Sequence, residues 1–463
     1  NYAVVVGGGG GPDEEINDIS VYTKQYMDGH YDQYMLGVST SEVMYDWQGK
    51  WLGNAFAVGS TFFLKFYTDY QGGYSYSVDP GTTWLTSMGS GSGATPAPYE
   101  VLGMDYLIPR LNITGEERTA EITLTAGLLT KKIKVRQSGG ANCDIIRFTS
   151  PTPGTQASAQ FSLSYASKAR QKMGLSALVA PTPSPPYTAS ILWSEGNVTF
   201  YTPMINYITT PEGPVNVVQV NVEPNTGTQG NAVVVLKNAS NEILWSWHVW
   251  VMAESSPDNV YVGYHNMNKS VMMDRPLGLS NSKYPRYQWG RKDPFMMDAT
   301  LLSGSFSTAA AWTGTVLSTG VDNSIKNPNV FLTASTGPYY NWLGNMGYNN
   351  FWNETDGKKS YFDPCPVGWR VPTYNNADVA PWQNEPPPYT NIVFSRQYFS
   401  GFNGAASGSG DYFWSATPRG YEAIYCHVSS TTSLTAVANS GSLPGYRAHG
   451  MGIRCVKDIS KKY

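Results

Sequence analysis

Five histidines are the first side chains to consider for catalysis or metal binding, because imidazole is both a general base and a common metal ligand. They are widely spaced, and none forms a His-Glu-x-x-His motif or a short-range pair with metal-ligand spacing. His248 stands between two tryptophans, which predicts a hydrogen-bonded core histidine. His427 follows Cys426, but neighbouring strand residues point to opposite faces, which argues against a Cys–His nucleophile pair. We expect no metal site and no catalytic base among His30, His248, His265, His427 and His449.

Carboxylates offer a second route to chemistry, as general acids and bases. The two clusters, residues 13–15 and Glu116 with Glu117, stand in turn-like, solvated contexts. A glycosidase needs two carboxyl groups about 5–10 Å apart across a cleft, and the sequence identifies no such pair. Five consecutive glycines at 7–11 lack the Gly-Lys-Ser/Thr of a phosphate-binding loop, and no nucleophile-elbow or dinucleotide motif occurs. We therefore expect a protein that is not an enzyme and needs no cofactor.

The four cysteines are too far apart for any Cys-x-x-Cys metal or redox motif. Cys365 lies in the turn-rich run DPCPVGWRVPT (363–373), and Cys455 lies in the short alternating strand GIRCVKD (452–458). We predict a Cys365–Cys455 disulfide that closes the C-terminal domain; two free, buried thiols are the alternative. Such a bond would contribute roughly 4–5 kcal/mol in the chain-entropy model. Cys143 and Cys426 could pair with each other or stay free.

Composition points to a mainly β, multidomain protein. A chain of 463 residues is too long for one core, so we expect about three domains. Only 14% of the residues are charged, while Gly, Pro, Tyr and Trp are abundant, which favours short strands and ordered turns. A net charge of −3 gives no reason to expect nucleic acid or an acidic membrane as partner. We expect no membrane span and, at Asn1, no signal peptide, as in a mature or trimmed chain.

Two hairpins have the clearest strand patterns. In residues 118–125 and 132–137 apolar and polar residues alternate around an Ala-Gly turn, so Ile122, Leu124, Ile133 and Val135 should face the core. In residues 231–236 and 243–250 both faces are apolar, which predicts a strand pair covered on both sides. The Pro-rich run 181–186 cannot be a central strand. Residues 16–50 show only a weak helical signal, and we assign them no structure.

The C-terminal motifs resemble a known family. The run at 363–373, then Tyr412 to Ala416 (YFWSA), then 452–458 are similar to the FISUMP (major paralogous) domain of Bacteroidota surface proteins. The resemblance covers about residues 260–458. It implies a secreted, disulfide-bearing, loop-rich mixed α/β domain that is C-type-lectin-like and has no defined catalytic site. We assign this domain to residues 254–463.

Two further resemblances divide the rest of the chain. The stretch from Asn112 to Ser138 resembles a BACON module, an immunoglobulin-like sandwich proposed to bind carbohydrate or mucin, and we assign it residues 55–139. The patterns around Cys143, Trp193 and His248 resemble fimbrillin-like (Mfa-like) surface proteins, which implies a β-sandwich over residues 140–253. Asp144 stands where that family often has Tyr. Residues 1–54 would be an N-terminal segment with an exchanged strand and a linker.

Together these resemblances imply a non-enzymatic extracellular or outer-membrane surface protein with a structural-adhesive role. We expect a fimbrial tip or accessory subunit that joins other subunits by β-strand addition, with the Val-rich N-terminus as candidate donor. The alternatives are a surface glycan-binding lipoprotein and a phage tail-fibre or virion protein with BACON-like modules.

Aromatic residues give the one compositional signal for a ligand, because their flat faces can stack on sugar rings. Trp342, Tyr348 and Trp352 stand among Asn and Gly rather than in an alternating strand, which favours exposure. We therefore predict them as ligand-stacking residues for a glycan or host surface ligand. The alternative is that such residues fill thin β cores.

Overall fold

The computed structural model describes most of the chain. The described residues are 18–25, 31–38, 40–52, 58–59, 62–87, 92–93, 102–148, 154–225, 228–253, 260–265, 268–273, 275–281, 283–295, 307–334, 340–344, 347–354, 358–374, 398–400, 405–408, 410–430, 433–435 and 445–458. The fold is mainly β and splits into two compact units, Asn1–Gly139 and Gly140–Tyr463. Among the described residues no helix is long and apolar enough to cross a membrane.

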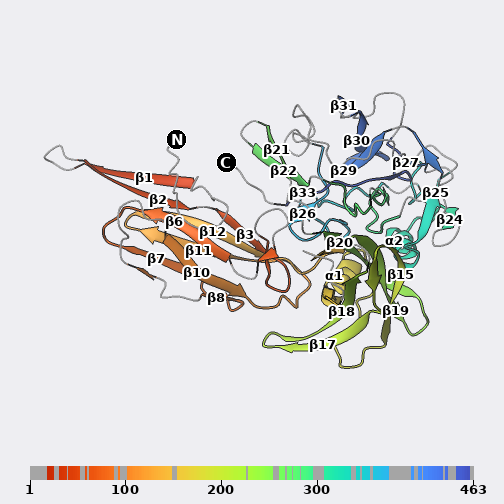
Figure 1. Ribbon diagram of the computed structural model, residues 1–463, viewed down its shortest axis with the longest axis horizontal. Coiled ribbons are helices and arrows are strands. Elements are labelled where there is room, and N and C mark those ends of the chain that lie inside the picture. The colour runs from red at the N-terminus through yellow and green to blue at the C-terminus, as the bar shows by residue number, and fades with distance from the viewer. Residues whose placement is uncertain are drawn as a thin grey trace. The chain divides into compact units, whose positions relative to one another are not determined.

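Unit 1 is a β-sandwich of two sheets, drawn in red to gold in Figure 1. One apolar cluster takes residues from both sheets, including Leu36 and Phe66 from one and Ile122 and Ile133 from the other. The first sheet has the order β1 (Asp18–Gln25), β2 (Tyr31–Val38), β6 (Phe62–Thr68), β10 (Leu102–Pro109), β8 (Leu85–Ser87). The second has the order β5 (Val58–Gly59), β4 (Trp51–Leu52), β3 (Glu42–Tyr45), β12 (Leu129–Gln137), β11 (Arg118–Ala126), β7 (Tyr74–Val78), β9 (Ser92–Gly93).

The β11–β12 hairpin confirms the alternation predicted from sequence. Ile122, Leu124, Ile133 and Val135 are fully buried, and Ile122 lies opposite Ile133. The predicted boundary after residue 54, in contrast, is not seen. β3 pairs in parallel with β12, with Val43 opposite Val135, so residues 42–45 belong to the same sheet as the hairpin. The described residues between 18 and 52 are thus part of the sandwich rather than a separate linker, while residues 1–17 lie outside the described residues.

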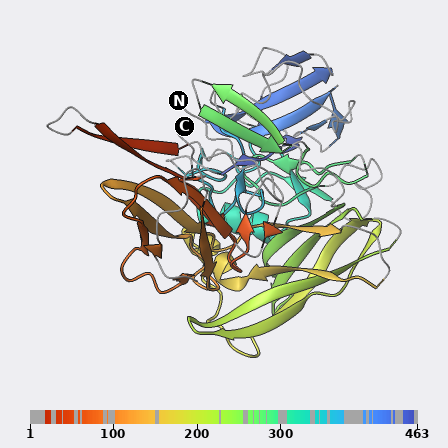
Figure 2. The ribbon, with the colours of Figure 1, turned by 60° about the vertical axis from the view of Figure 1, so that its left-hand side comes forward.

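Unit 2 begins with a second pair of sheets, drawn in yellow to green in Figure 2. The two sheets pack through Phe161 and Trp247, whose rings stack at 5.3 Å between centroids. One sheet has the order β13 (Cys143–Phe148), β20 (Ile243–Ala253), β19 (Gly230–Asn238), β15 (Tyr187–Gly196). The other has β14 (Ala157–Ser162), β18 (Gly213–Pro224) and β16 (Val198–Phe200), and β17 (Met204–Thr210) also pairs with β18; helix α1 is Leu163–Lys172.

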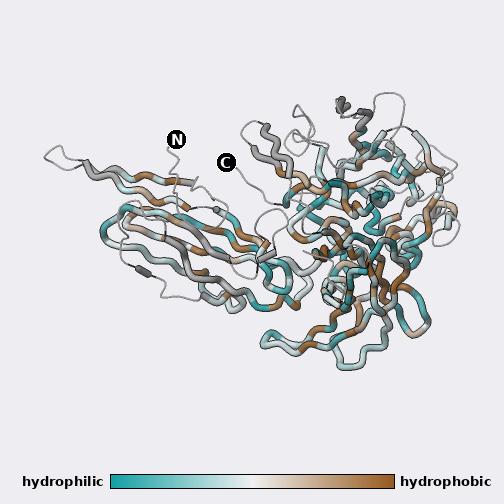
Figure 3. The backbone as a smooth tube through the Cα atoms, in the orientation of Figure 1, coloured by the Kyte–Doolittle hydropathy of each residue, from teal (hydrophilic) through white to brown (hydrophobic). Residues whose placement is uncertain are grey.

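The β19–β20 hairpin is the core of unit 2, and its apolar residues show as brown stretches in Figure 3. Its turn forms as predicted: the Asn238 Oδ1 atom accepts bonds from the backbone N–H groups of Ser240 and Glu242, and Asn241 is left-handed with φ 65°. Trp247 faces Phe161, while Trp250, on the opposite face, donates its indole N–H to the Leu279 carbonyl. The prediction that both faces of this strand pair are covered is therefore confirmed.

The rest of unit 2 contains short strands joined by long connections. We predicted a division after residue 253, whereas residues 140–463 form one compact unit. One sheet is β21 (Val260–His265), β22 (Asn268–Met273), β33 (Val456–Lys457), β26 (Trp369–Arg370), and another is β23 (Tyr287–Gln288), β32 (Gly450–Met451), β27 (Tyr398–Phe399), β28 (Ala406–Ser407). The remaining elements are β24 (Ser307–Ala310) with β25 (Val330–Thr333), β29 (Asp411–Arg419) with β30 (Glu422–Ser430) and β31 (Ser433–Thr435), and helix α2 (Leu317–Lys326).

Candidate functional site

The Cys365–Cys455 disulfide predicted from sequence is present, with an S–S distance of 2.07 Å and a sequence separation of 90. Both cysteines are fully buried. Cys365 precedes β26 and Cys455 precedes β33, and these two strands pair through Arg370 and Val456. Val456 also pairs with Met272 of β22. The bond therefore fastens the point where three distant segments of unit 2 meet.

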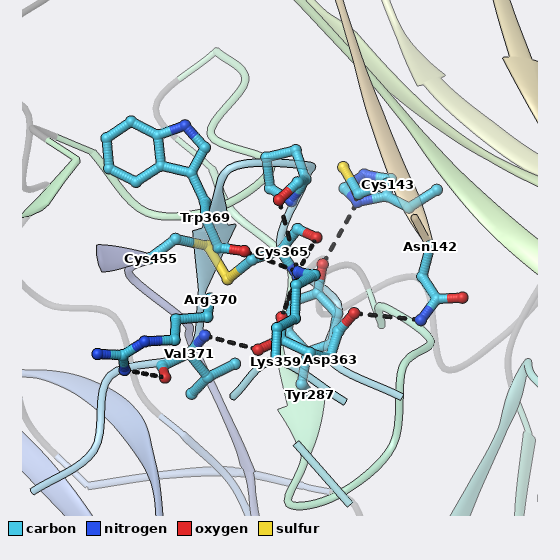
Figure 4. Close-up of a disulfide and its surroundings, with 12 residues drawn as sticks. Asn142, Cys143, Tyr287, Lys359, Asp363, Cys365, Trp369, Arg370, Val371 and Cys455 are labelled. Atoms are coloured by element: carbon cyan, nitrogen blue, oxygen red, sulfur yellow. Dashed lines mark hydrogen bonds and ion pairs between the residues drawn. A yellow bond between two sulfur atoms is a disulfide. The ribbon is translucent and has the colours of Figure 1, made fainter. Parts of the chain in front are cut away.

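A buried ion pair holds the turn beside the disulfide (Figure 4). The Asp363 carboxylate accepts bonds from the backbone N–H groups of Cys365 and Val371, at 2.7 and 2.8 Å, and from Lys359 Nζ at 2.9 Å. Lys359 Nζ also donates to the carbonyls of Cys365 and Trp369. Burial raises the pKa of Asp363, and Lys359 and the two N–H groups oppose that rise. This pair fixes the backbone from 363 to 371.

The arrangement of Cys143, His248 and Asn231 resembles that of a cysteine nucleophile triad. Parallel pairing of β13 with β20 puts Cys143 opposite His248, and the Cys143 Sγ atom lies 3.6 Å from His248 Nδ1. The Asn231 Oδ1 atom lies 2.8 Å from His248 Nε2. The Asn231 Nδ2 group donates to Glu195 and to the Gly278 carbonyl, which fixes the amide so that its oxygen faces the imidazole. A thiol, an imidazole and an amide in this order are the parts of a papain-like site.

Burial favours a neutral thiol and a neutral imidazole in this triad, which are the wrong protonation states for nucleophilic attack. All three side chains are at most 2% exposed. Burial, followed by the nearby Asp144 carboxylate, raises the pKa of the Cys143 thiol well above its usual value. Burial also lowers the pKa of His248 to about 3. A reactive cysteine needs the thiolate, which low pKa and a cationic neighbour favour, so this trio acts as a hydrogen-bonded core group.

His248 is thus the satisfied core histidine that the sequence predicts. Its Nε2–H donates to Asn231, and its Nδ1 atom lies within 3.6 Å of the Cys143 thiol and 3.4 Å of the Tyr287 hydroxyl. The sequence did not reveal that Cys143 lies beside it, because the two residues are 105 positions apart and meet through a parallel pairing.

The structure also tests the remaining cysteine predictions, a Cys143–Cys426 disulfide and a Cys426–His427 pair. Cys143 and Cys426 are both buried and free, so the second disulfide that we considered is not formed. Cys426 is buried, whereas His427 is half-buried and stacks on Tyr412 at 4.4 Å between ring centroids. Burial raises the pKa of the Cys426 thiol to about 12. Among the described residues no group of His, Cys, Asp and Glu could hold a metal ion.

The predicted stacking residues are mostly in the core, which corrects that prediction. Trp342 and Trp352 are 1% and 0% exposed. Their indole N–H groups donate to the carbonyls of Trp289 and Arg291, at 2.7 and 3.1 Å. Tyr348 is half-buried and packs edge-to-face on Phe351. The tryptophans therefore hold this loop in place and offer no ring to a ligand.

Two buried arginines of unit 2 donate hydrogen bonds to backbone carbonyls. Arg447 is 1% exposed and donates to the carbonyls of Tyr348 and Gly420. Arg291 is 2% exposed and donates to the carbonyls of Val330 and Asn327, the latter just beyond the C-terminus of α2. Buried backbone carbonyls need such donors when no ladder supplies them. These roles were not predicted from sequence, because each arginine stands in a stretch without a strand or helix pattern.

The buried histidines predict a loss of stability in acid. An imidazole in the unfolded chain binds a proton near pH 6.5, whereas burial lowers the pKa of His248 and of His449 to about 3. Between these pH values the unfolded state binds more protons, so stability falls as pH falls, by about 1.4 kcal/mol per pH unit for each histidine. At pH 5 we expect a loss of about 2 kcal/mol from His248 alone.

Urea unfolding between pH 8 and pH 5 measures this slope. His248→Gln, which cannot be protonated, should give a shallower dependence of unfolding free energy on pH than the wild-type chain. An identical slope in both proteins would show that His248 is already charged in the folded state.

No family model matches the chain, and no curated protein matches it. Among solved structures, similar ones include an endo-fucoidan hydrolase from glycoside hydrolase family 107, at 10% identity and a TM-score of 0.16 over 50% of this chain and 34% of that chain. Domains 5–6 of the S-layer protein SbsC match at 12% identity and a TM-score of 0.20, over 51% and 100% of the two chains. Human protocadherin-24 EC1-2 matches at 8% identity and a TM-score of 0.16, over 46% and 94%.

Proposed function

We propose that this chain is a non-enzymatic structural and adhesive protein of the bacterial cell surface, a fimbrial tip or accessory subunit. The observation that supports it best is the state of the reactive groups: Cys143 and His248 are locked in the core, and Cys365 and Cys455 form a cross-link. Such a cross-link persists in oxidising, extracytoplasmic compartments. The proposal includes immunoglobulin-like character for the two sandwiches and FISUMP character for residues 254–463.

Assembly by strand addition is the second part of this proposal. Among the described strands β17 pairs only with β18, so it forms an edge. Its sequence, MINYITT, has no charge and no proline, the devices that protect natural edges from pairing. Met204 and Tyr207 are 49% and 38% exposed. We take β17 as the acceptor for a strand from another subunit, and the valines at 4–6, outside the described residues, as the candidate donor.

Charges on this edge should stop assembly. Tyr207→Lys combined with Thr209→Lys is expected to abolish an SDS-resistant ladder of the wild-type chain, because an incoming strand would bury two ammonium groups. Ladders on unboiled gels and native mass spectrometry measure the effect. Leu128→Lys is the control, since Leu128 is 77% exposed at the β11–β12 turn and belongs to unit 1, whereas β17 belongs to unit 2.

Two results would count against strand addition at β17. One is a ladder that persists unchanged in the double variant. The other is a wild-type chain that stays strictly monomeric when incubated with its own fimbrial subunits.

A surface glycan-binding lipoprotein is the second candidate function. The polar, nearly uncharged outer face of the sheet that contains β14 and β18 favours it.

A further inference from the structure

One face of the sheet formed by β14, β18, β16 and β17 carries a regular array of amides. Register places Gln160 opposite Gln219 and Ser158 opposite Asn221, and on the other side of β18 it places Met204 opposite Gln219. Paired residues of a ladder point to the same face. The opposite face carries Phe161 with the buried Val218, Val220 and Val222, whereas Val215 and Val217, on the same side as Gln219, are also buried and end the accessible part of that side. We call this outer array the amide face; it comprises Ser158, Gln160, Tyr201, Met204, Asn206, Gln219, Asn221 and Glu223.

Hydrogen bonds between the amides hold the face in one arrangement. Gln219 Oε1 accepts from Gln160 Nε2 at 3.2 Å and from Asn206 Nδ2 at 2.9 Å. Gln219 Nε2 then donates to Asn221 Oδ1 at 2.9 Å. The network crosses three strands and ends at Asn221, whose Nδ2 group meets no acceptor among the described residues. Because an amide has two N–H donors and an oxygen with two lone pairs, Asn206, Gln219 and Asn221 keep hydrogen-bonding capacity for an external ligand beyond these bonds.

The amide face has almost no charge. The strands β14, β16, β17 and β18 contain no Lys or Arg, and Glu223 is their single carboxylate. Tyr201 Oη donates to Glu223 at 2.5 Å, and Gln156 donates to the same carboxylate at 3.3 Å. An ordinary solvated face looks different: the outer face of β12 carries exposed Lys132 and Lys134. The amide face therefore presents neutral polar side chains to solvent, where an ordinary solvated face presents charged ones.

We propose that the amide face binds a neutral polysaccharide. Sugar hydroxyls each donate and accept, which matches amides and a tyrosine hydroxyl, and the apolar C–H faces of sugar rings match the rings and thioethers at the rim. Tyr201 and Met204, 39% and 49% exposed, supply that rim. The lack of cations disfavours nucleic acids and acidic glycans, and Glu223 repels them. This proposal rests on the adhesive function and gives its ligand class.

Affinity electrophoresis of the full chain in gels with galactomannan, α-mannan or xyloglucan tests the proposal, with polygalacturonate as the acidic comparison. We expect retardation by at least one neutral polymer and none by polygalacturonate. Gln219→Ala with Asn221→Ala should weaken binding at least tenfold, and so should Tyr201→Ala alone. Both variants should remain folded, which circular dichroism checks, since these side chains reach solvent and lie outside the apolar core. Thr123→Ala with Thr125→Ala, on the outer face of β11, is the matched control.

Three results would overturn the site. They are no retardation by any neutral polymer, equal retardation of the Gln219/Asn221 variant and the wild-type chain, and loss of self-association rather than of polysaccharide binding in that variant. A failed adhesive function would appear elsewhere, as a chain absent from the cell surface or as an unchanged ladder in the Tyr207/Thr209 variant. The two failures are therefore distinguishable.

Discussion

Replacing Cys365 and Cys455 together by Ala is expected to lower the free energy of unfolding by about 4–5 kcal/mol. The disulfide closes a loop with a sequence separation of 90, and a cross-link over such a length removes much of the entropy of the unfolded chain in the chain-entropy model. Both side chains are fully buried, so Ala avoids burying a hydroxyl. Urea unfolding of the oxidised proteins, followed by tryptophan fluorescence, gives the difference.

Reduction provides the internal control for this result. Dithiothreitol should bring the wild-type unfolding midpoint to that of the double variant and should leave the variant unchanged. Cys426→Ala removes a buried but free thiol and should cost only about 1 kcal/mol, as for a small core truncation. If alkylation and mass spectrometry of unreduced protein labelled Cys365 and Cys455, or if dithiothreitol left the wild-type midpoint in place, the disulfide would have no part in stability.

Local pairings were predictable from sequence because their signals are local. In β11 and β12 the in–out alternation and the Ala126–Gly127 turn lie within one hairpin, and Gly127 adopts the positive φ of 59° that the turn needs. In β19 and β20 the two asparagines specify the turn, and a lack of alternation specifies burial on both faces. The disulfide was predictable because each cysteine stands in a distinctive short motif.

Distant pairings left no such signal. β3 joins β12 in parallel, and a parallel pairing has no connecting turn that a sequence could announce. Residues 42–45 are also buried throughout, so they lack the alternation of a half-exposed strand. The Cys143–His248 contact arises in the same way, from β13 beside β20. In each case the contact depends on pairing between segments that are distant in sequence, and the residues around either segment do not indicate its partner.

The stacking prediction failed for a related reason. Asn and Gly around Trp342 and Trp352 indicated an exposed loop, but indole donors bonded to the carbonyls of Trp289 and Arg291 fold that loop inward. The exposed aromatic on the amide face, Tyr201, instead follows directly after the short strand β16. The residue types around a loop tryptophan therefore indicate the backbone conformation of the loop, but they do not indicate whether the tryptophan side chain is buried.

The largest single-residue effect is expected for Lys359→Met, which should cost about 3–5 kcal/mol because it leaves the Asp363 carboxylate buried without its cation. Asp363 is 0% exposed and Lys359 13% exposed, at 2.9 Å and four positions apart. The chain offers a matched pair at its surface: Lys326 and Asp322 are also four apart and 2.9 Å from each other, but 38% and 23% exposed. Lys326→Met should cost less than about 1 kcal/mol.

The pH dependence of the Lys359→Met loss separates charge from packing. Burial already raises the pKa of Asp363, and without Lys359 that pKa should rise further. A carboxyl group with a raised folded pKa binds its proton more tightly in the folded state, so stability falls as pH rises from about 4 through the folded pKa. The variant should therefore approach wild-type stability near pH 4 and lose most above neutral pH. A loss equal at both pH values would mean that Lys359 acts through its methylenes and its bonds to carbonyls, with Asp363 already protonated in the wild-type chain.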